Sequence, residues 1–566
     1  MVNVKNLFGM AVMATALVAC SSNDDLASNG HEGNQTGEAY ASFRINLPTT
    51  SGTRADDPKP GTPSFDGGTA KEYEVKNGTI LIFDNAGNFV TSAQLGTMNP
   101  WTDVKSDGVT TAAIATVKLS DVKVGGSYKA LVLLNNNSET TPKVTLPTTA
   151  DTYTSWSKDV NKVDVDQYVS TDGIFMANAP KYIDAASEPT TLVKVNNICA
   201  SREEAQAKAA TTVYVERGLA KVTMQDYKTD GYEIAAGTTY AGDKVKITDW
   251  KLDVTNKSTF PVHQTGGLLK AWDKIWGTGR FFDNTSSSFK RVYWGVDPNY
   301  SGDALQNLTA CQTAFNMIKN SEVAGKAGKD HPQYCLENTF DLANMMQGQT
   351  TRVVFKAVYT PKALEGKTGD DLTFFKIGNN TAIWTKANLE KQIKTVALTV
   401  MGITDAAEQD KYGVNLEAGG ENSIAKKAGQ HLIKAENITY TGDAADNKVD
   451  QKVVNTINEK LGLTAAVGIS TYLHGEAYYI ARIKHFNELT PWNPGEAYDS
   501  NNEKYLGRYG VLRNNWYDLS VTSVSGLGYP DVPEVKPELP DDENDQYINV
   551  EVKILDWAKR SQSIDL

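Results

Sequence analysis

The chain has 566 residues, a formal net charge of −12 and a pI near 5.2. This acidic balance argues against a nucleic-acid partner, because phosphates are bound by a basic face. Hydrophobic residues make up 40% and charged residues 22% of the chain, which is a globular balance and excludes a wholly disordered protein. The 45 glycines and 25 tyrosines, together with many short β-branched runs, predict a mainly β protein with many turns.

The N-terminal segment has the pattern of an export signal. Lys5 precedes a short apolar core over residues 7–17, which is too short to span a bilayer. The sequence LVAC at residues 17–20 resembles a bacterial lipobox, which implies that residues 1–19 are removed and that Cys20 is acylated. Several acyl chains anchor a protein stably in a membrane. The alternative is a plain secretory signal in which Cys20 is incidental.

The first predicted strand lies within residues 38–48. Its apolar residues alternate with polar ones, a period of two that is typical of a strand with one buried face. These apolar residues are Ala41, Phe43, Ile45 and Leu47. Pro48 ends the strand, and a polar loop continues to Arg54. We predict that an Arg-specific protease cuts the Arg54–Ala55 bond and releases residues 20–54, so that this strand is a temporary plug.

The strands that follow fall into two groups. The first group predicts a β domain over residues 55–229, with a hairpin at 79–94, a fully buried strand at 128–134 and a strand pair or bent strand at 213–224. The second group predicts a domain over residues 230–530, with strands at 244–256, 352–360, 478–486 and 517–521. The alternation slips at Asp249, which predicts a bulge. Helices are predicted at 268–276, 309–319 and 452–461, the last of them amphipathic.

The end of the chain combines an acidic segment with an apolar strand. Residues 531–545 are rich in proline, Asp and Glu, which predicts an extended, self-repelling linker. Residues 546–566 are β-prone again, and four apolar residues alternate with polar ones: Ile548, Val550, Val552 and Ile554. An unpaired strand edge recruits other strands. The tail therefore predicts a partner groove in a neighbouring molecule, where it replaces the plug; the alternative is that it completes its own domain.

Motifs of catalysis and metal binding are absent from the sequence. The six histidines show no HExxH or other metal spacing, and there is no phosphate-binding loop and no GxSxG motif. We therefore predict no enzyme activity, no metal and no cofactor. Glycoside hydrolysis by two carboxylates that are distant in the chain stays open as an alternative, because sequence spacing does not reveal such a pair. Besides Cys20, the chain has Cys199, Cys311 and Cys335, an odd number that defines no disulfide framework. Buried free thiols are predicted, while a Cys311–Cys335 bridge is chemically allowed.

In their order along the chain, these features resemble the type V fimbrial subunits of Bacteroides-type bacteria, especially the minor, Mfa-type fimbrilins. The resemblance is carried by the lipobox at Cys20, the Arg54–Ala55 bond, the RNNWYDL segment at 513–519, the Gly526-x-Gly528-x-Pro530 segment, the acidic linker, and the closing pattern of Val550, Val552 and Trp557. It implies two transthyretin-like β-sandwich domains, with short helical insertions in the second.

The resemblance also implies a pathway of assembly. A lipoprotein precursor is anchored in the outer membrane, and an Arg-specific surface protease cuts it after Arg54. The vacated groove then receives the tail, from Ile548 onward, of another copy or of a related pilin, and a fimbria grows at the cell surface. Tip subunits of this family tend to lack such a tail, so its presence favours a stalk subunit. A fimbria is compatible with adhesion, but no residue identifies a host or bacterial receptor.

Two hypotheses about function follow from the sequence. The first is a structural fimbrial subunit that polymerises by strand exchange. The second is a monomeric outer-membrane surface lipoprotein that binds glycans through stacking of its aromatic side chains. A glycan-binding lipoprotein needs neither the Arg54 site nor the tail strand, so these two features favour the first hypothesis.

Overall fold

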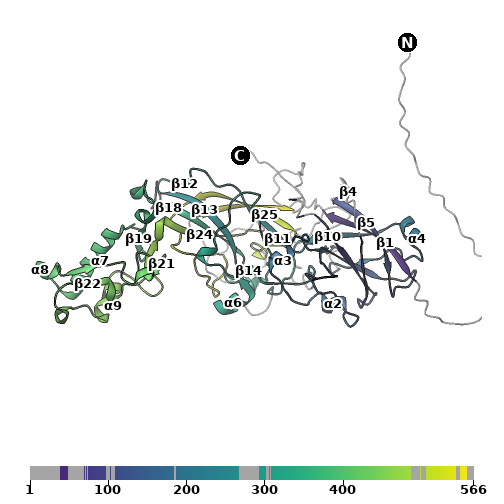
Figure 1. The fold of residues 1–566 in the computed structure, drawn as a ribbon, viewed down its shortest axis with the longest axis horizontal. Coiled ribbons are helices and arrows are strands. Elements are labelled where there is room, and N and C mark those ends of the chain that lie inside the picture. Colours follow the sequence, from purple (N-terminus) through teal and green to yellow (C-terminus); the bar gives the residue numbers. More distant parts are fainter. Residues whose placement is uncertain are drawn as a thin grey trace, which may run out of the picture.

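We analysed a computed structural model of the chain. It describes residues 38–48, 69, 72, 74–96, 102–103, 109–183, 187–266, 292–300, 305, 307–485, 498, 505–542 and 548–556. The protein is mainly β, as predicted. Figure 1 shows an elongated arrangement: a first sheet at one end, a pair of sheets in the middle, and a mixed region with helices at the other end. Among the described residues, no helix is both long and apolar enough to cross a bilayer.

The first sheet has the strand order β3-β2-β6-β8-β10-β1-β5-β4, with β9 paired to β6. Its strands are β1 (Ala39–Pro48), β2 (Gly78–Phe83), β3 (Phe89–Gln94), β4 (Thr102–Asp103), β5 (Val109–Leu119), β6 (Lys129–Leu134), β8 (Met176–Asn178), β9 (Val193–Lys194) and β10 (Thr211–Arg217). Side chains of β2 and β6 share one apolar core with those of β1, β5 and β10, so the sheet closes on itself as a sandwich does. The predicted hairpin is confirmed as β2 and β3.

The strand β6 is buried on both faces, as its continuous apolar run predicted. Alternate side chains of β6 reach the core shared with β1, and the others reach a second cluster. This second cluster includes Trp156 of α2 (Tyr153–Trp156) and Tyr168 of α3 (Val165–Tyr168). A short helix, α4 (Arg202–Ala207), begins at the capping side chain of Ser201. The chain leaves this sheet at Gly218, directly after β10.

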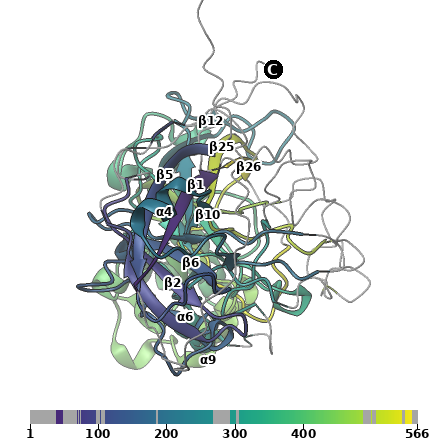
Figure 2. The ribbon, with the colours of Figure 1, turned by 90° about the vertical axis from the view of Figure 1, so that its right-hand side faces the viewer.

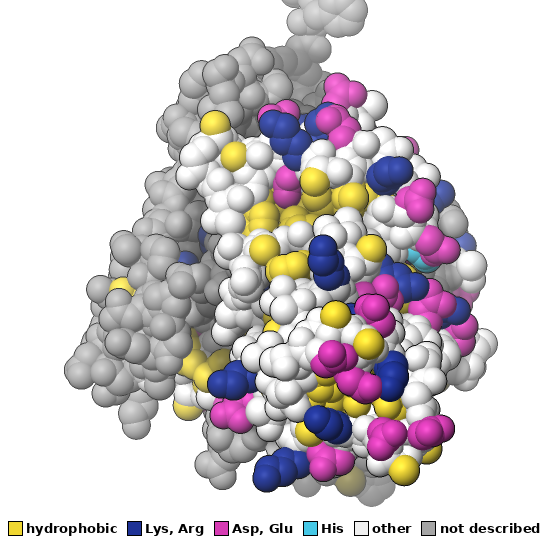
Figure 3. Space-filling view, turned by 90° about the vertical axis from the view of Figure 1, so that its left-hand side faces the viewer, with side chains coloured by type: hydrophobic (Ala, Val, Ile, Leu, Met, Phe, Trp, Pro, Cys, Tyr) yellow, Lys and Arg dark blue, Asp and Glu magenta, His cyan; other side chains and the backbone are white. Residues whose placement is uncertain are grey.

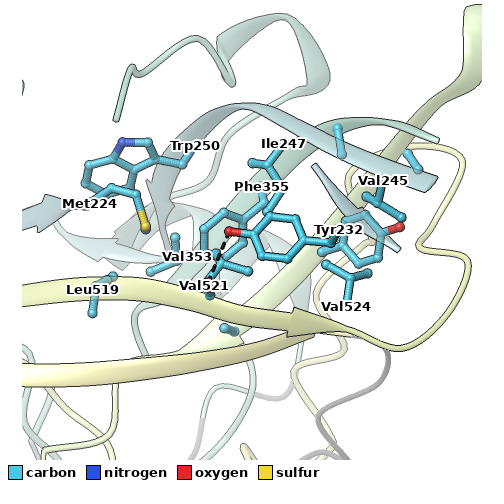
Figure 4. Packing of buried hydrophobic residues seen from close by; sticks show 14 of the residues in the cluster. Met224, Tyr232, Val245, Ile247, Trp250, Val353, Phe355, Leu519, Val521 and Val524 are labelled. Atoms are coloured by element: carbon cyan, nitrogen blue, oxygen red, sulfur yellow. Dashed lines mark hydrogen bonds between the residues drawn. The ribbon is translucent and has the colours of Figure 1, made fainter. Parts of the chain in front are cut away.

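Two four-stranded sheets form the middle of the molecule. One has the order β17-β11-β25-β26 and the other β12-β13-β18-β24. Their strands are β11 (Ala220–Met224), β12 (Tyr232–Glu233), β13 (Lys244–Asp253), β17 (Gln333–Cys335), β18 (Arg352–Thr360), β24 (Glu476–Arg482), β25 (Asn515–Val524) and β26 (Ile548–Asp556). One large apolar cluster fills the space between the two sheets. Figure 4 shows Met224, Leu519, Val521 and Val524 of one sheet opposite Ile247, Trp250, Val353 and Phe355 of the other.

Short elements connect the sheets. β14 (Thr255–Asn256) pairs with β16 (Phe315–Asn316), and β15 (Ser258–Thr259) pairs with β7 (Asn161–Lys162). The bulge predicted near Asp249 is confirmed, because the register of β13 on β18 shifts between Ile247 and Asp249. The helix predicted at 309–319 is shorter: α6 (Leu308–Ala314) ends where β16 begins. The helix predicted at 268–276 lies outside the described residues.

An insertion between β18 and β24 has a core of its own. Its helices are α7 (Lys386–Met401), α8 (Ala406–Gln409) and α9 (Gln451–Lys460), and its strands are β19 (Phe374–Ile377), β20 (Tyr412–Val414), β21 (Gly429–His431), β22 (Ile438–Tyr440) and β23 (Ile469–Tyr472). The amphipathic helix predicted at 452–461 is confirmed as α9. The predicted helical insertions were expected to be short, and α7 is longer than expected, with 16 residues. On the face of this end that Figure 3 shows, acidic and basic side chains are interspersed.

The acidic segment after β25 is not a self-repelling linker over residues 531–542. Val535 packs in an apolar cluster, and Asp541 and Asp542 are fully buried. Arginines account for the difference: two from the middle sheets hydrogen-bond the backbone of this segment, and Arg508 lies 3.4 Å from the carboxylate of Asp542. Arg352 donates to the carbonyl of Pro533 at 2.7 Å, and Arg482 donates to the carbonyl of Asp541 at 2.6 Å. Such partners allow carboxylates to be buried.

The three cysteines of the described region are free and buried, as predicted. They are Cys199, Cys311 and Cys335. Burial raises the pKa of the Cys335 thiol to about 12. The structure therefore contains no Cys311–Cys335 bridge, although both residues are within its described part.

Candidate functional site

The strand β1 is an internal strand of the first sheet, although it is the first described element of the chain. It pairs antiparallel with β5 from Ala39 to Pro48. On its other side it pairs parallel with β10 from Phe43 to Asn46. Tyr40 extends this second side by exchanging backbone hydrogen bonds with Cys199, at 2.9 and 2.8 Å. Both edges of β1 are therefore hydrogen-bonded to the same domain (Figure 2).

The inward face of β1 is fully buried. Ala39, Ala41, Phe43 and Ile45 have no solvent-exposed surface. They pack with side chains of β2, β6 and β10 in the core of the first sheet. Leu47 continues the strand opposite Thr111, as the register shows. Burying a Phe or Ile side chain stabilises a fold by about 1.5–3 kcal/mol, so β1 contributes substantially to this core.

The outward face of β1 is partly covered, which the alternation alone did not predict. Ser42 donates to the carbonyl of Ala205 in α4 at 2.8 Å, and its hydroxyl lies 2.8 Å from that of Thr116. Arg202 donates to the carbonyl of Thr116 at 2.8 Å. Its guanidinium also lies 5.7 Å from the ring centre of Tyr40. The helix α4 thus covers one part of the strand, next to an open hollow of about 680 Å³.

Charged groups contribute little to holding β1 in the first sheet. Glu38 pairs with Lys118 and accepts a hydrogen bond from the hydroxyl of Tyr40 at 2.9 Å. The hydrogen bond from Lys118 is the main cause of a lowered pKa of Glu38. Both partners of the ion pair are more than half exposed, and exposed pairs are screened by water. Apolar burial and two backbone ladders therefore hold the strand.

The tail strand β26 occupies a different kind of position. It lies at the edge of its sheet and pairs only with β25 within the described chain. In this register Val550 is opposite Val521, and Val550 is half-buried against the core between the two sheets. Val552 is opposite Leu519, and Ile554 is opposite Tyr517. The structure thus places the first strand and the tail strand in two separate sheets.

A buried charged group fixes the chain between β1 and β2. Glu72 forms an ion pair with Lys221 at 2.7 Å, and both side chains are at most 2% exposed. The hydroxyl of Tyr334 donates to the carboxylate at 2.7 Å, and Arg217 donates to the Glu72 carbonyl at 2.9 Å. Lys221 also lies 3.8 Å from the ring centre of Trp516. Sequence reasoning missed this anchor, because one acidic residue in a loop carries no pattern.

A second buried group fixes the chain just before β26. The carboxylate of Asp541 accepts hydrogen bonds from Thr350 and Tyr498, each at 2.9 Å. Asp542 accepts from the hydroxyl of Tyr509 at 2.9 Å and lies 3.4 Å from a guanidinium nitrogen of Arg508. Burial raises the pKa of Asp541 to about 6, and the charge of Arg482 opposes that shift. The acidic composition of this segment signalled charge but not its partners.

Several predicted residues lie outside the described part of the chain. They are Cys20, the predicted lipidation site; Arg54 and Ala55, the two sides of the predicted cleavage bond; and Trp557 of the tail. Within the described ranges, no group of three or more His, Cys, Asp and Glu side chains is arranged to hold a metal ion. Buried His263 is used in packing: its ring nitrogens lie 2.6 Å from the carboxylate of Glu216 and 3.1 Å from the carbonyl of Trp294.

Comparison with known families identifies the class of the C-terminal part. Residues 470–563 match the family model described as "Major fimbrial subunit protein type IV, Fimbrillin, C-terminal". This stretch contains β24, β25 and β26. The match confirms the predicted resemblance to fimbrilins, whose place is a fimbria at the cell surface. No curated protein matches the chain significantly.

The chain also aligns with solved structures of bacterial proteins, at low identity. A candidate cell-adhesion protein from Parabacteroides distasonis aligns over 92% of this chain and 99% of its own, with 11% identity and a TM-score of 0.38. The tip fimbrial protein Mfa3 from Porphyromonas gingivalis, with a C-terminal truncation, aligns over 92% and 100%, with 11% identity and a TM-score of 0.29. The fimbrial anchor protein Mfa2 from Porphyromonas gingivalis aligns over 57% and 79%, with 11% identity and a TM-score of 0.18. The likeness to fimbrilins therefore depends on the family match of residues 470–563.

Proposed function

We propose that this chain is a structural subunit, of the stalk, of a cell-surface fimbria that polymerises by donor-strand exchange. It is exported as a lipoprotein acylated at Cys20, an Arg-specific surface protease cuts it after Arg54, and β1 then leaves the first sheet. The observation that supports this most directly is the position of β1, paired on both sides within the sheet. A strand that a single cut just after it, at Arg54, would separate from the rest of the chain is thus also a central strand of the sheet.

Removal of β1 creates a binding site for another strand. It leaves one backbone edge unpaired on β5 and one on β10, and it exposes the apolar core that Phe43 and Ile45 covered. Unpaired edges and exposed apolar surface both recruit a replacement strand. While the chain is intact, covalent attachment gives β1 a large effective concentration. Cleavage removes that advantage, so the precursor stays monomeric until it is processed.

The tail strand β26 is suited to leave its own sheet. It has one ladder of hydrogen bonds, with β25, whereas a strand in the vacated position has two. Each additional hydrogen bond contributes about 1 kcal/mol net, so donation replaces a one-sided pairing with a more stable two-sided pairing. The buried Asp541 and Asp542 hold the chain just before this tail. From Asp542 to Ile548 the chain reaches at most about 20 Å, which limits how far the donor strand moves.

Processing and assembly are tested together on protein sheared from the cell surface. We expect a mature N-terminus at Ala55 by mass spectrometry and a ladder of SDS-resistant polymers on an unboiled gel. Arg54→Ala should abolish both, whereas Arg44→Ala, a substitution inside β1, should leave the cut at Arg54 intact. Deletion of residues 548–566 should abolish the ladder and leave the cut.

The opposite result is equally informative. An acylated N-terminus at Cys20 in a single monomer band would show that β1 stays in place, and it would favour the glycan-binding lipoprotein. A ladder that persists after deletion of residues 548–566 would exclude the tail as the donor strand.

A further inference from the structure

The inward side chains of β1 and β5 are complementary in size. In the antiparallel register, small residues of one strand face large residues of the other. The pairs are Ala39 with Leu119, Ala41 with Val117, Phe43 with Ala115, and Ile45 with Ala113. All eight residues are buried in the same core. Directly opposed side chains in a sheet are in contact, so this alternation of size contributes to which residues fit beside β5.

The position that β1 occupies is therefore narrow at one end and wide at the other. At the narrow end, Leu119 and Val117 fill the space, and only alanine stands opposite them. At the wide end, Ala115 and Ala113 leave room for an aromatic and a branched side chain. Protein interiors are close-packed, so both overfilling and underfilling are destabilising. A strand that runs in the direction of β1 fits this position when its four successive inward residues are small, small, aromatic and β-branched.

The tail of this chain does not match that pattern in its best alternating register. Its inward candidates are Ile548, Val550, Val552 and Ile554, four large or medium side chains. With Ile548 in the place of Ala39, the narrow end is overfilled, and Val552 leaves a void in the place of Phe43.

Other registers along the same direction are worse. A shift of two residues places Gln546 or Asp556 among the buried core positions. A shift of one residue turns Glu551 and Lys553 inward. In its own sheet the same tail is an edge strand with β25 as its one neighbour among the described strands, and there Val550 and Val552 stand opposite Val521 and Leu519.

We propose that the groove vacated by β1 is shaped for a donor strand from a different subunit, with small, small, aromatic and β-branched inward residues, and not for the tail of a second copy of this chain. This inference rests on the proposed strand exchange and narrows its partner. The chain then joins two different neighbours: one inserts a strand beside β5, and another receives β26.

A displacement experiment on the full chain tests this selectivity. The chain is cut after Arg54, with β1 carrying a fluorescent label and held without a covalent bond, and unlabelled peptides compete for its place. The three peptides are residues 38–48, the native tail 547–557, and the same tail with Ile548→Ala, Val550→Ala and Val552→Phe. We expect residues 38–48 and the substituted tail to displace the label at concentrations at least about tenfold lower than the native tail requires.

Each outcome separates the two proposals. Equal or better displacement by the native tail would overturn the selectivity while supporting strand exchange. Failure of every peptide, including residues 38–48, would overturn strand exchange itself and the selectivity with it.

A variant of the groove gives an independent test. The double substitution Leu119→Ala with Val117→Ala widens the narrow end. The concentration of native tail needed for displacement, divided by that of the substituted tail, should therefore fall by about tenfold or more relative to the unaltered groove. Ile114→Ala is the matched control on β5, because Ile114 is 61% exposed. It should leave the ranking of the peptides unchanged. An unaltered ranking in the widened groove would also overturn the proposal.

Discussion

Substitution of Phe43 tests whether β1 is a removable part of the fold. Phe43 is fully buried and stands between Ala115 of β5 and Thr211 of β10. It is the largest of the fully buried side chains of β1. Truncation of a buried Phe to Ala costs about 3–5 kcal/mol, from lost transfer free energy and the cavity that remains. We therefore expect Phe43→Ala to lower the free energy of unfolding of the uncut precursor by about that amount, a large share of a typical total of about 5–15 kcal/mol.

The same substitution has a second effect after cleavage at Arg54. Because each 1.4 kcal/mol is a factor of ten, a loss of 3–5 kcal/mol weakens retention of the cut strand by about 10²–10⁴. Urea unfolding measures the first effect, and the release of a labelled β1 segment measures the second. Polymers assembled from this variant should have wild-type stability, because Phe43 has left with the propeptide.

The control and the refuting result are both available in the same chain. Ile114→Ala on the exposed face of β5 should change unfolding by no more than about 0.5 kcal/mol. If polymers of Phe43→Ala carried the full stability loss of the precursor, β1 would still be present in them. The reasoning would also fail if the uncut variant unfolded like the wild type.

Three further predictions follow from buried polar groups. Glu72→Ala leaves the buried Lys221 ammonium without its carboxylate, and should lower the free energy of unfolding by about 3–5 kcal/mol. Glu74→Ala, in an exposed pair, is the control, and equal losses in the two variants would contradict the anchor. Burial raises the pKa of Asp541 to about 6 from an ordinary value of 3.8, so the folded chain holds a proton that the unfolded chain has lost. Its contribution to stability is present below pH 4 and is lost as the pH rises through 6. In Asp541→Asn, the urea midpoint of unfolding should change less between pH 4 and pH 7 than it does in the wild type. An equal change with pH in the two proteins would refute this. The three buried thiols should resist iodoacetamide in the native protein and react on unfolding, as counted by mass spectrometry; native labelling of any of them would contradict the structure.

Local patterns in the sequence predicted many elements well. Period-two alternation located β1 and β26, the apolar run located β6, and the phase slip at Asp249 located the bulge of β13. Helical spacing located α9. These features are determined by residues within a few positions of one another, so one stretch of sequence contains their whole cause.

The same kind of reasoning failed where the partner is distant in the chain. The acidic segment near Asp541 was interpreted as a solvated linker, because Arg352, Arg482 and Arg508 lie elsewhere in the sequence. The insertion was underestimated, since the buried face of α7 packs against β19, β20 and α9, which lie before and after it in the chain. The anchor at Glu72 left no local signal, as its partner Lys221 is on β11.

The sequence by itself determined that an alternating strand precedes Arg54 and that another alternating strand comes near the end of the chain. It also determined the fimbrillin-like C-terminal stretch. Only the tertiary structure decided that β1 lies between β5 and β10, that β26 is an edge strand, and that Leu119 and Val117 face alanines. The physical reason is that strand pairing and side-chain packing join residues far apart in the chain. Which two strands meet depends on the fit of a whole core, and no single stretch of sequence contains that fit.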